Sequence, residues 1–216
     1  MLRTVVFDFD GTLVDSNAIK REAFLRAVSA HPGGFLRMVR VLNGTRGDRH
    51  DVFRVYEVDR LGGTGLEDPE AVEALVAAFS VDVDSAVVAA AEMPGASSML
   101  DHLRRTGLRA VLSSATPLFN LRDIVARRGW LGWFDHIAGH PTSKVETLQA
   151  VMQQYGHSAA AMAVVGDGAD DRASAAAVGC AFYPVGEARG AGGPQTTFTL
   201  HQLQHLLAAG HNTPTA

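Results

Sequence analysis

Residues 5–16 of the chain read VVFDFDGTLVDS, a string in which an apolar, β-branched run leads into Asp8 and Asp10 and then into a glycine. This pattern predicts a buried strand of a parallel sheet, which delivers both carboxylates to a loop at its C-terminal end. Ligands of such sheets bind beyond the carboxyl ends of the strands. Two neighbouring carboxylates repel each other unless a cation lies between them, and Mg²⁺ is a hard cation that takes oxygen ligands. A turn or a calcium loop is the alternative, because Asp-x-Asp-Gly occurs in both.

A second stretch repeats this design: residues 161–171 read AMAVVGDGADD. An apolar strand again ends in acidic residues, and its two glycines let the backbone turn sharply near a charged ligand. Asp167 and Asp171 are therefore candidate metal ligands. For Asp170, a helix N-cap or a solvated acid is the simpler interpretation. The stretch lacks the 12-residue spacing and the terminal Glu of a calcium loop.

Hydroxyl groups follow the apolar strand predicted at residues 108–112, in the sequence SSAT at residues 113–116. A hydroxyl at a strand end, beside backbone N–H groups, can hold a phosphate oxygen. Ser114 is the candidate for this contact, and Ser113 is the alternative one register away. A cap for the helix that starts near Pro117 explains the same residues without a ligand.

Lys144 opens a predicted helix and is one of only two lysines, the other being Lys20. A lysine in the first turn of a helix is unfavourable with respect to the helix dipole. The placement is explained if the ammonium group contacts a phosphate and Asp8. A solvated surface lysine is the alternative.

Taken in order, these four motifs resemble those of the haloacid dehalogenase superfamily, in its phosphoglycolate phosphatase and β-phosphoglucomutase-like branch with a helical cap. The string Asp-x-Asp-x-Thr-Leu matches the first motif, and Gly-Asp-x-x-x-Asp matches the fourth. Ser114 and Lys144 stand where the second and third motifs are expected. The resemblance implies a Mg²⁺-dependent phosphatase that hydrolyses a small phosphorylated metabolite through an aspartyl-phosphate.

The resemblance also assigns roles to individual residues. Asp8 is the nucleophile, and Asp10 is the acid and base, whose backbone carbonyl also binds the metal. Asp8, Asp167 and Asp171 supply carboxylate ligands. The residues that the resemblance places at the phosphate are Gly11, Thr12, Ser114, Ala115 and Lys144.

Other activities stay open at this point. True dehalogenases of the superfamily lack a counterpart of Asp10, so its presence favours phosphoryl transfer. A sugar phosphomutase of the β-phosphoglucomutase type is the nearest rival. A phosphonate hydrolase would use a cap lysine as a Schiff-base amine, and Lys20 keeps that branch open. A catalytically silent binding protein on the same fold is the alternative outside enzymes.

Strands alternating with helices predict a doubly wound parallel α/β sheet, a Rossmann-like core, in residues 1–15 and 93–216. Residues 16–92 interrupt this alternation and form an all-helical cap inserted after the first strand. Helices are expected within the cap at residues 17–30, 35–42, 51–61, 67–79 and 84–91. Later elements are expected as strands at 108–112, 137–138, 161–165 and 180–183, helices at 96–105, 117–128, 143–155, 172–178 and 200–209, a glycine-rich loop at 186–194 and a frayed tail.

Substrate selection is assigned to the cap. We expect the loop at residues 43–49 to present Arg46 or Arg49 to an anionic group of the substrate, and Lys20 to face the site from the first cap helix. The alternative is that these cations only solvate their helices. A small helical cap favours a small, diffusible substrate over a phosphoprotein.

Composition sets the remaining expectations. The chain has 216 residues, 47% hydrophobic, with a formal net charge of −4, so we expect no nucleic-acid partner. No signal peptide is expected, and no apolar run reaches the ~18 residues of a membrane span. The lone Cys180 excludes an internal disulfide and fits a reducing, cytoplasmic location. The oligomeric state stays open.

Overall fold

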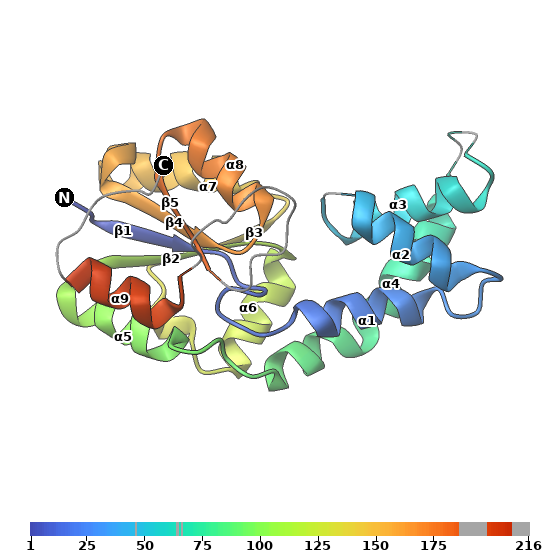
Figure 1. Cartoon of the computed structure of the whole chain (residues 1–216), viewed down its shortest axis with the longest axis horizontal. Helices are drawn as coiled ribbons and strands as arrows, with labels where there is room; N and C mark the ends of the chain where they lie inside the picture. The colour runs from blue at the N-terminus through green and yellow to red at the C-terminus, as the bar shows by residue number, and fades with distance from the viewer. Residues whose placement is uncertain (46, 64, 66, 186–197, 209–216) are drawn as a thin grey trace. The chain divides into compact units, whose positions relative to one another are not determined.

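The computed structural model describes residues 1–45, 47–63, 65, 67–185 and 198–208 (Figure 1). The chain forms two compact units. The core unit comprises Met1–Asp15 and Ala90–Ala216, and the helical unit comprises Ser16–Ala89.

The core unit is a five-stranded sheet in the order β3-β2-β1-β4-β5, and every neighbouring pair is parallel. Figure 1 shows α7 and α8 on one face of the sheet and α5, α6 and α9 on the other. The predicted doubly wound α/β core is therefore confirmed. The elements are β1 (Thr4–Phe7), α5 (Ala96–Thr106), β2 (Arg109–Pro117), α6 (Leu118–Arg127), β3 (His136–His140), α7 (Lys144–Tyr155), β4 (Met162–Gly166), α8 (Ala169–Val178), β5 (Ala181–Pro184) and α9 (Leu200–Ala208), with short 3-10 turns at Leu131–Trp133 and Ala159–Ala161.

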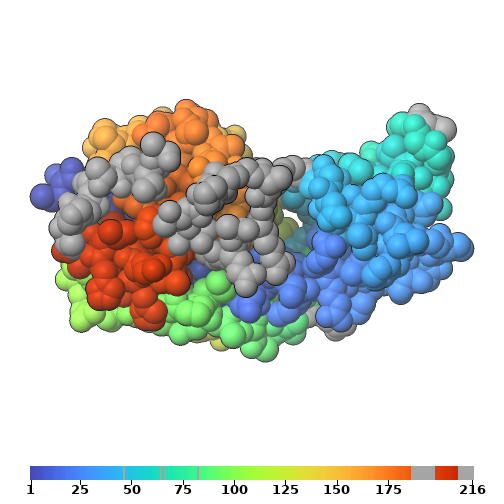
Figure 2. All heavy atoms as spheres, in the orientation of Figure 1, coloured from blue at the N-terminus to red at the C-terminus, as the bar shows by residue number. Residues whose placement is uncertain are grey.

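Apolar side chains hold the helices on both faces of the sheet. On one face, Val6, Val111 and Val164 of the strands pack in one buried cluster with Leu148 and Val151 of α7. Burying a side chain of this size stabilises the fold by about 1.5–3 kcal/mol. On the other face α9 lies against α5 (Figure 2), where the Ser98 hydroxyl donates to Gln204 Oε1 at 2.9 Å.

The strand register determines which residues meet at the C-terminal edge of the sheet. Phe7, the last residue of β1, pairs with Leu112 on one side and Val165 on the other. Asp8 therefore emerges between β2 and β4. Its backbone N–H still donates to the carbonyl of Val165 at 2.9 Å, so the sheet fixes the start of the loop.

β2 extends beyond the predicted end at residue 112 and runs to Pro117. Ser113, Ser114 and Thr116 are nearly fully buried within it. β3 is likewise longer than the two residues predicted. Pairing with β3 explains the extension, since Ser113 lies opposite Ala138 and a neighbouring strand satisfies backbone groups that polar side chains alone would not.

The helical unit is a group of four helices around an aromatic cluster. The helices are α1 (Asn17–Ala27), α2 (Gly34–Gly44), α3 (Arg49–Arg60) and α4 (Pro69–Ala89). Phe24 of α1, Phe53 of α3 and Phe79 of α4 have ring centroids 4.3–6.1 Å apart. Each such aromatic pair adds about 0.5–1.5 kcal/mol beyond its buried area.

The prediction of separate helices at 67–79 and 84–91 is wrong, because α4 is a single helix. Residues 80–83 contain no glycine or proline that would end a helix. The buried stripe of α4 also continues through them with steps of three or four residues. Its members are Val72, Leu75, Phe79, Val83 and Val87.

The predicted glycine-rich loop at 186–194 and the predicted tail lie outside the described residues. Among the helices that the structure describes, none is both long and apolar enough to span a bilayer.

Candidate active site

Asp8 lies at the centre of the candidate site. The residue is 7% exposed, and its carboxylate accepts a hydrogen bond from Lys144 Nζ on Oδ1 at 3.0 Å. The hydroxyl of the fully buried Thr12 lies 3.5 Å from Oδ2. A glycine at position 11, with φ of +75°, turns the chain back so that its N–H donates to the carbonyl of Val14 at 2.8 Å. These contacts hold the loop and the Asp8 carboxylate in place.

Lys144 brings three acidic residues together. Besides Asp8, its ammonium group contacts Asp171 Oδ1 at 2.5 Å and Asp170 Oδ2 at 2.9 Å. Lys144 is the first residue of α7. A capping box fixes that helix end: the Ser143 hydroxyl accepts from the Glu146 N–H, and the Glu146 carboxylate accepts from the Ser143 N–H.

Burial and mutual repulsion disturb the protonation of this cluster. Burial raises the pKa of Asp8 well above its ordinary value, and nearby carboxylates raise it further against the opposite effect of Lys144. Burial likewise raises the pKa of Asp171 to about 6, although Lys144 opposes the shift. Burial disfavours the charged form of Lys144, but the carboxylates of Asp8, Asp171 and Asp170 outweigh it and raise its pKa. The cluster therefore holds more negative charge than one ammonium group compensates.

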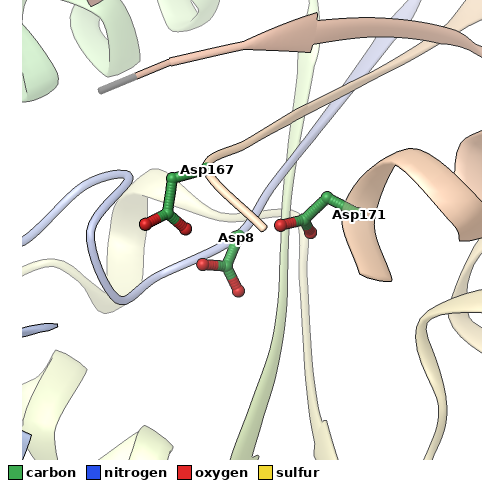
Figure 3. Close-up of side chains that lie close together, drawn as sticks. All are labelled: Asp8, Asp167 and Asp171. Atoms are coloured by element: carbon green, nitrogen blue, oxygen red, sulfur yellow. The ribbon is translucent and has the colours of Figure 1, made fainter. Parts of the chain in front are cut away.

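Asp8, Asp167 and Asp171 form an acidic group (Figure 3), in which one carboxylate oxygen from each residue lies within 4.8 Å of the other two. Three carboxylates at this separation are a donor set for a hard divalent cation. A cation bound there would also offset the repulsion by Asp171 and Asp167, which adds to the effect of burial on the pKa of Asp8. The residues present thus fit a metal such as Mg²⁺.

Glycine spacing makes room for this group. A Cβ atom at Gly166 would lie 2.2 Å from the carboxylate carbon of Asp171. The N–H of Gly168 donates to Asp171 Oδ2 at 3.1 Å, which holds that carboxylate at the start of α8. The Gly-Asp-Gly sequence therefore allows the strand end and the helix start to approach each other closely.

Asp10 contacts two hydroxyl groups of β2. The hydroxyl of Thr116 lies 3.2 Å from Asp10 Oδ2, and that of Ser114 lies 3.5 Å from the same oxygen. The Thr116 N–H donates to Ser114 Oγ at 3.1 Å. Thr116 was not among the predicted site residues. The sequence could have predicted Thr116, because residues 114 and 116 lie on the same side of an extended strand.

The candidates differ in how the structure places them. Asp8, Lys144, Asp167 and Asp171 lie together, and Asp10 lies with Ser114. Ala115 is exposed at the end of β2. Asp170, which the sequence suggested was a cap or a solvated acid, is not the N-cap of α8, which is Gly168; its exposed carboxylate pairs with Lys144.

The cap candidates lie in the helical unit. Lys20 is half-buried on α1. Arg49 opens α3, where its guanidinium group donates to the Ser80 hydroxyl at 2.8 Å and lies 5.0 Å from the ring centre of Phe79. Arg49 is thus a packed residue of this unit, and its contact with substrate stays a prediction. Arg46 lies outside the described residues.

A family model described as haloacid dehalogenase-like hydrolase matches residues 2–179. The chain therefore belongs to the haloacid dehalogenase-like hydrolases, as the four motifs predicted. No curated protein matches the chain.

Solved structures show the same fold at low sequence identity. CbbY from Rhodobacter sphaeroides, in complex with phosphate, is 17% identical with a TM-score of 0.70, over 94% of this chain and 96% of that one. A predicted phosphoglycolate phosphatase from Haemophilus somnus is 16% identical with a TM-score of 0.68, over 85% of each chain. A Thermotoga maritima protein provisionally assigned as a β-phosphoglucomutase is 16% identical with a TM-score of 0.70, over 96% of this chain and 99% of that one. At such identities the likeness supports the fold alone.

Proposed function

We propose that this hydrolase is a Mg²⁺-dependent phosphatase that cleaves a small phosphorylated metabolite through a phosphoryl-Asp8 intermediate. The single observation that carries the proposal is the contact of one ammonium group, that of Lys144, with both Asp8 and Asp171. This contact brings together a nucleophilic carboxylate, a cation for the phosphoryl oxygens and an acidic metal site.

The metal belongs to the proposal. Asp8, Asp167 and Asp171 would hold Mg²⁺ through carboxylate oxygens, and Asp10 would add its backbone carbonyl. When bound, the ion neutralises charge on the phosphoryl oxygens and on the surrounding carboxylates.

The chain's own residues perform the chemistry in two displacements. A carboxylate oxygen of Asp8 bonds to phosphorus while the bond from phosphorus to the ester oxygen breaks. Asp10 gives its proton to that departing oxygen, which leaves as the alcohol. Asp10 then takes a proton from water, whose oxygen attacks phosphorus and releases Asp8 and inorganic phosphate. The contacts of Thr116 and Ser114 with Asp10 orient its carboxyl group for both transfers.

A small substrate is supported by a relative of the same fold. CbbY has been solved with phosphate, and a mutant of it with xylulose-1,5-bisphosphate. A sugar phosphate or another small phosphate ester is therefore the proposed substrate class. Lys20, Arg46 and Arg49 of the helical unit are the proposed contacts for a second anionic group on the substrate.

The test is hydrolysis of p-nitrophenyl phosphate by the whole chain, with Mg²⁺ or with EDTA. We expect Asp8→Asn to lose about 10⁴-fold in kcat, because the amide cannot act as the nucleophile. A peptide containing Asp8 should also gain the mass of one phosphoryl group after rapid quenching. Asp123→Asn is the matched control, since Asp123 is an exposed residue of α6 paired with Arg127. Full activity in Asp8→Asn, or activity unaffected by EDTA, would contradict the proposal. Conversion of β-glucose 1-phosphate only with a bisphosphate primer would favour the mutase.

A further inference from the structure

We propose that Asp170 is a displaceable counter-ion of Lys144. In the free enzyme it occupies the position on the ammonium group that the substrate's phosphoryl group takes, and it withdraws when phosphate binds. The inference rests on the proposed function and goes beyond it, because it assigns to Asp170 control over phosphate affinity.

Lys144 has no spare hydrogen-bond donor for a phosphoryl oxygen. An ammonium group has three N–H donors. Three carboxylates lie around it, those of Asp8 at 3.0 Å, Asp171 at 2.5 Å and Asp170 at 2.9 Å. A phosphoryl oxygen that binds Lys144 must therefore displace one of these carboxylates.

Burial indicates which carboxylate leaves. The side chain of Asp8 is 8% exposed and that of Asp171 is 1% exposed, whereas that of Asp170 is 61% exposed. Withdrawing a buried carboxylate leaves it without compensation in a low-dielectric site, at considerable cost. An exposed carboxylate exchanges its ion pair for water at little cost. Asp171 is held further by the N–H of Gly168.

The backbone at Gly168 allows Asp170 to fold back onto Lys144. A Cβ atom at position 168 would lie 2.4 Å from Asp170 Oδ1. Any other side chain there would move the Asp170 carboxylate out of its present place. The absence of a side chain at Gly168 thus lets the Asp170 carboxylate reach the ammonium group of Lys144.

The consequence is weaker binding of phosphate, as substrate and as product. Asp170 competes for Lys144, and its negative charge repels the incoming dianion. We expect Asp170→Asn and Asp170→Ala each to lower the Kd of inorganic phosphate by about two- to fivefold, the range of an exposed ion pair. KM for a phosphate ester should fall by a similar factor without a rise in kcat. The difference between variant and wild type should shrink at high salt.

The experiment is calorimetric titration of the whole chain with inorganic phosphate in the presence of Mg²⁺. It compares wild type, Asp170→Asn, Asp170→Ala and the control Asp123→Asn, which removes the same charge from another exposed helix position. Tighter binding in both variants at position 170, beyond any change in the control, supports the proposal. Unchanged or weaker phosphate binding in either variant overturns it, and a purely structural defect would lower kcat and raise KM. Phosphate binding does not depend on turnover, so this result is separate from the test of phosphatase activity in Asp8→Asn.

Discussion

Replacing Lys144 with methionine tests the electrostatic account of the site. Methionine keeps an unbranched chain of similar length and removes the ammonium group. Asp8 and Asp171, both nearly fully buried, then lose the cation that lies 3.0 and 2.5 Å from them. The loss should appear as reduced stability of the metal-free protein and should depend on pH.

The magnitude follows from burial. Removing one partner of a buried ion pair costs about 3–5 kcal/mol, and this cost applies where the carboxylates are ionised. The pKa of Asp171 is already raised to about 6 in the wild type. A raised folded-state pKa means that the folded state binds the proton more tightly, so stability is greatest at low pH and falls as the pH rises through about 6. Without Lys144 this pKa rises further. We therefore expect a loss of about 3–5 kcal/mol at pH 8 and about 1 kcal/mol or less at pH 5.

Urea unfolding in EDTA, at pH 5 and pH 8, measures both values. Trp130 and Trp133 are the two tryptophans of the chain, and both lie in the core unit, so their fluorescence reports unfolding of the unit that holds the site. Added Mg²⁺ should restore stability at pH 8, by about 2.7 kcal/mol at a concentration one hundred times its Kd.

Lys20→Met is the matched control, because Lys20 is the other lysine of the chain and lies in the helical unit, whereas the acidic cluster belongs to the core unit. It should change the unfolding free energy of the core unit by about 0.5 kcal/mol or less at either pH. The reasoning fails if Lys144→Met is as stable as wild type at pH 8. An equal loss at pH 5 and pH 8 would also refute it, because lost packing would then explain the result without charge.

Two further predictions concern neighbours of the cluster. Gly166→Ala should weaken Mg²⁺ binding by about tenfold or more, because the added Cβ would lie 2.2 Å from the Asp171 carboxylate carbon. Calorimetric titration with Mg²⁺ measures this affinity. An unchanged affinity would show that Asp171 is not a metal ligand. Thr116→Val should lower kcat by about three- to tenfold with little change in KM, since an intramolecular hydrogen bond typically contributes about 0.5–1.5 kcal/mol net, whereas Thr116→Ser should retain activity. Full activity in Thr116→Val would refute the role of the hydroxyl 3.2 Å from Asp10, and a loss confined to Thr116→Ser would show that the methyl group matters instead.

Much of the architecture could be predicted because parallel sheets obey a simple rule. Buried strands of such a sheet are continuous apolar runs, and their carboxyl ends meet at one edge. Asp8 and Asp167 each follow such a run, so their approach in space was predictable from sequence. Lys144 was found through its unfavourable place in the first turn of a helix together with its match to the third motif of the family. The prediction failed for α4, where the polar residues Ser80 and Asp82 concealed a continuous buried stripe.

The remaining contacts depend on side-chain geometry that a pattern does not contain. Thr116 reaches Asp10 only because β2 continues to Pro117, and that extension comes from pairing with β3. Asp170 reaches Lys144 because position 168 has no Cβ. Periodicity predicts the face on which a residue lies, but it does not predict which of two adjacent acids turns toward a cation.

The charge of the site explains why Asp170 has to leave Lys144 before an anion binds. The site holds four carboxylates, those of Asp8, Asp167, Asp170 and Asp171, and one ammonium group, so its ionised form carries three excess negative charges. A divalent cation reduces this excess to one, and a phosphoryl dianion still meets net repulsion. Three of the four acids, Asp8, Asp167 and Asp171, belong to the proposed metal site, and Asp8 and Asp171 are nearly fully buried. Asp170 alone among them lies outside that group, so its withdrawal from Lys144 is the step that lets an anion approach without breaking the metal site.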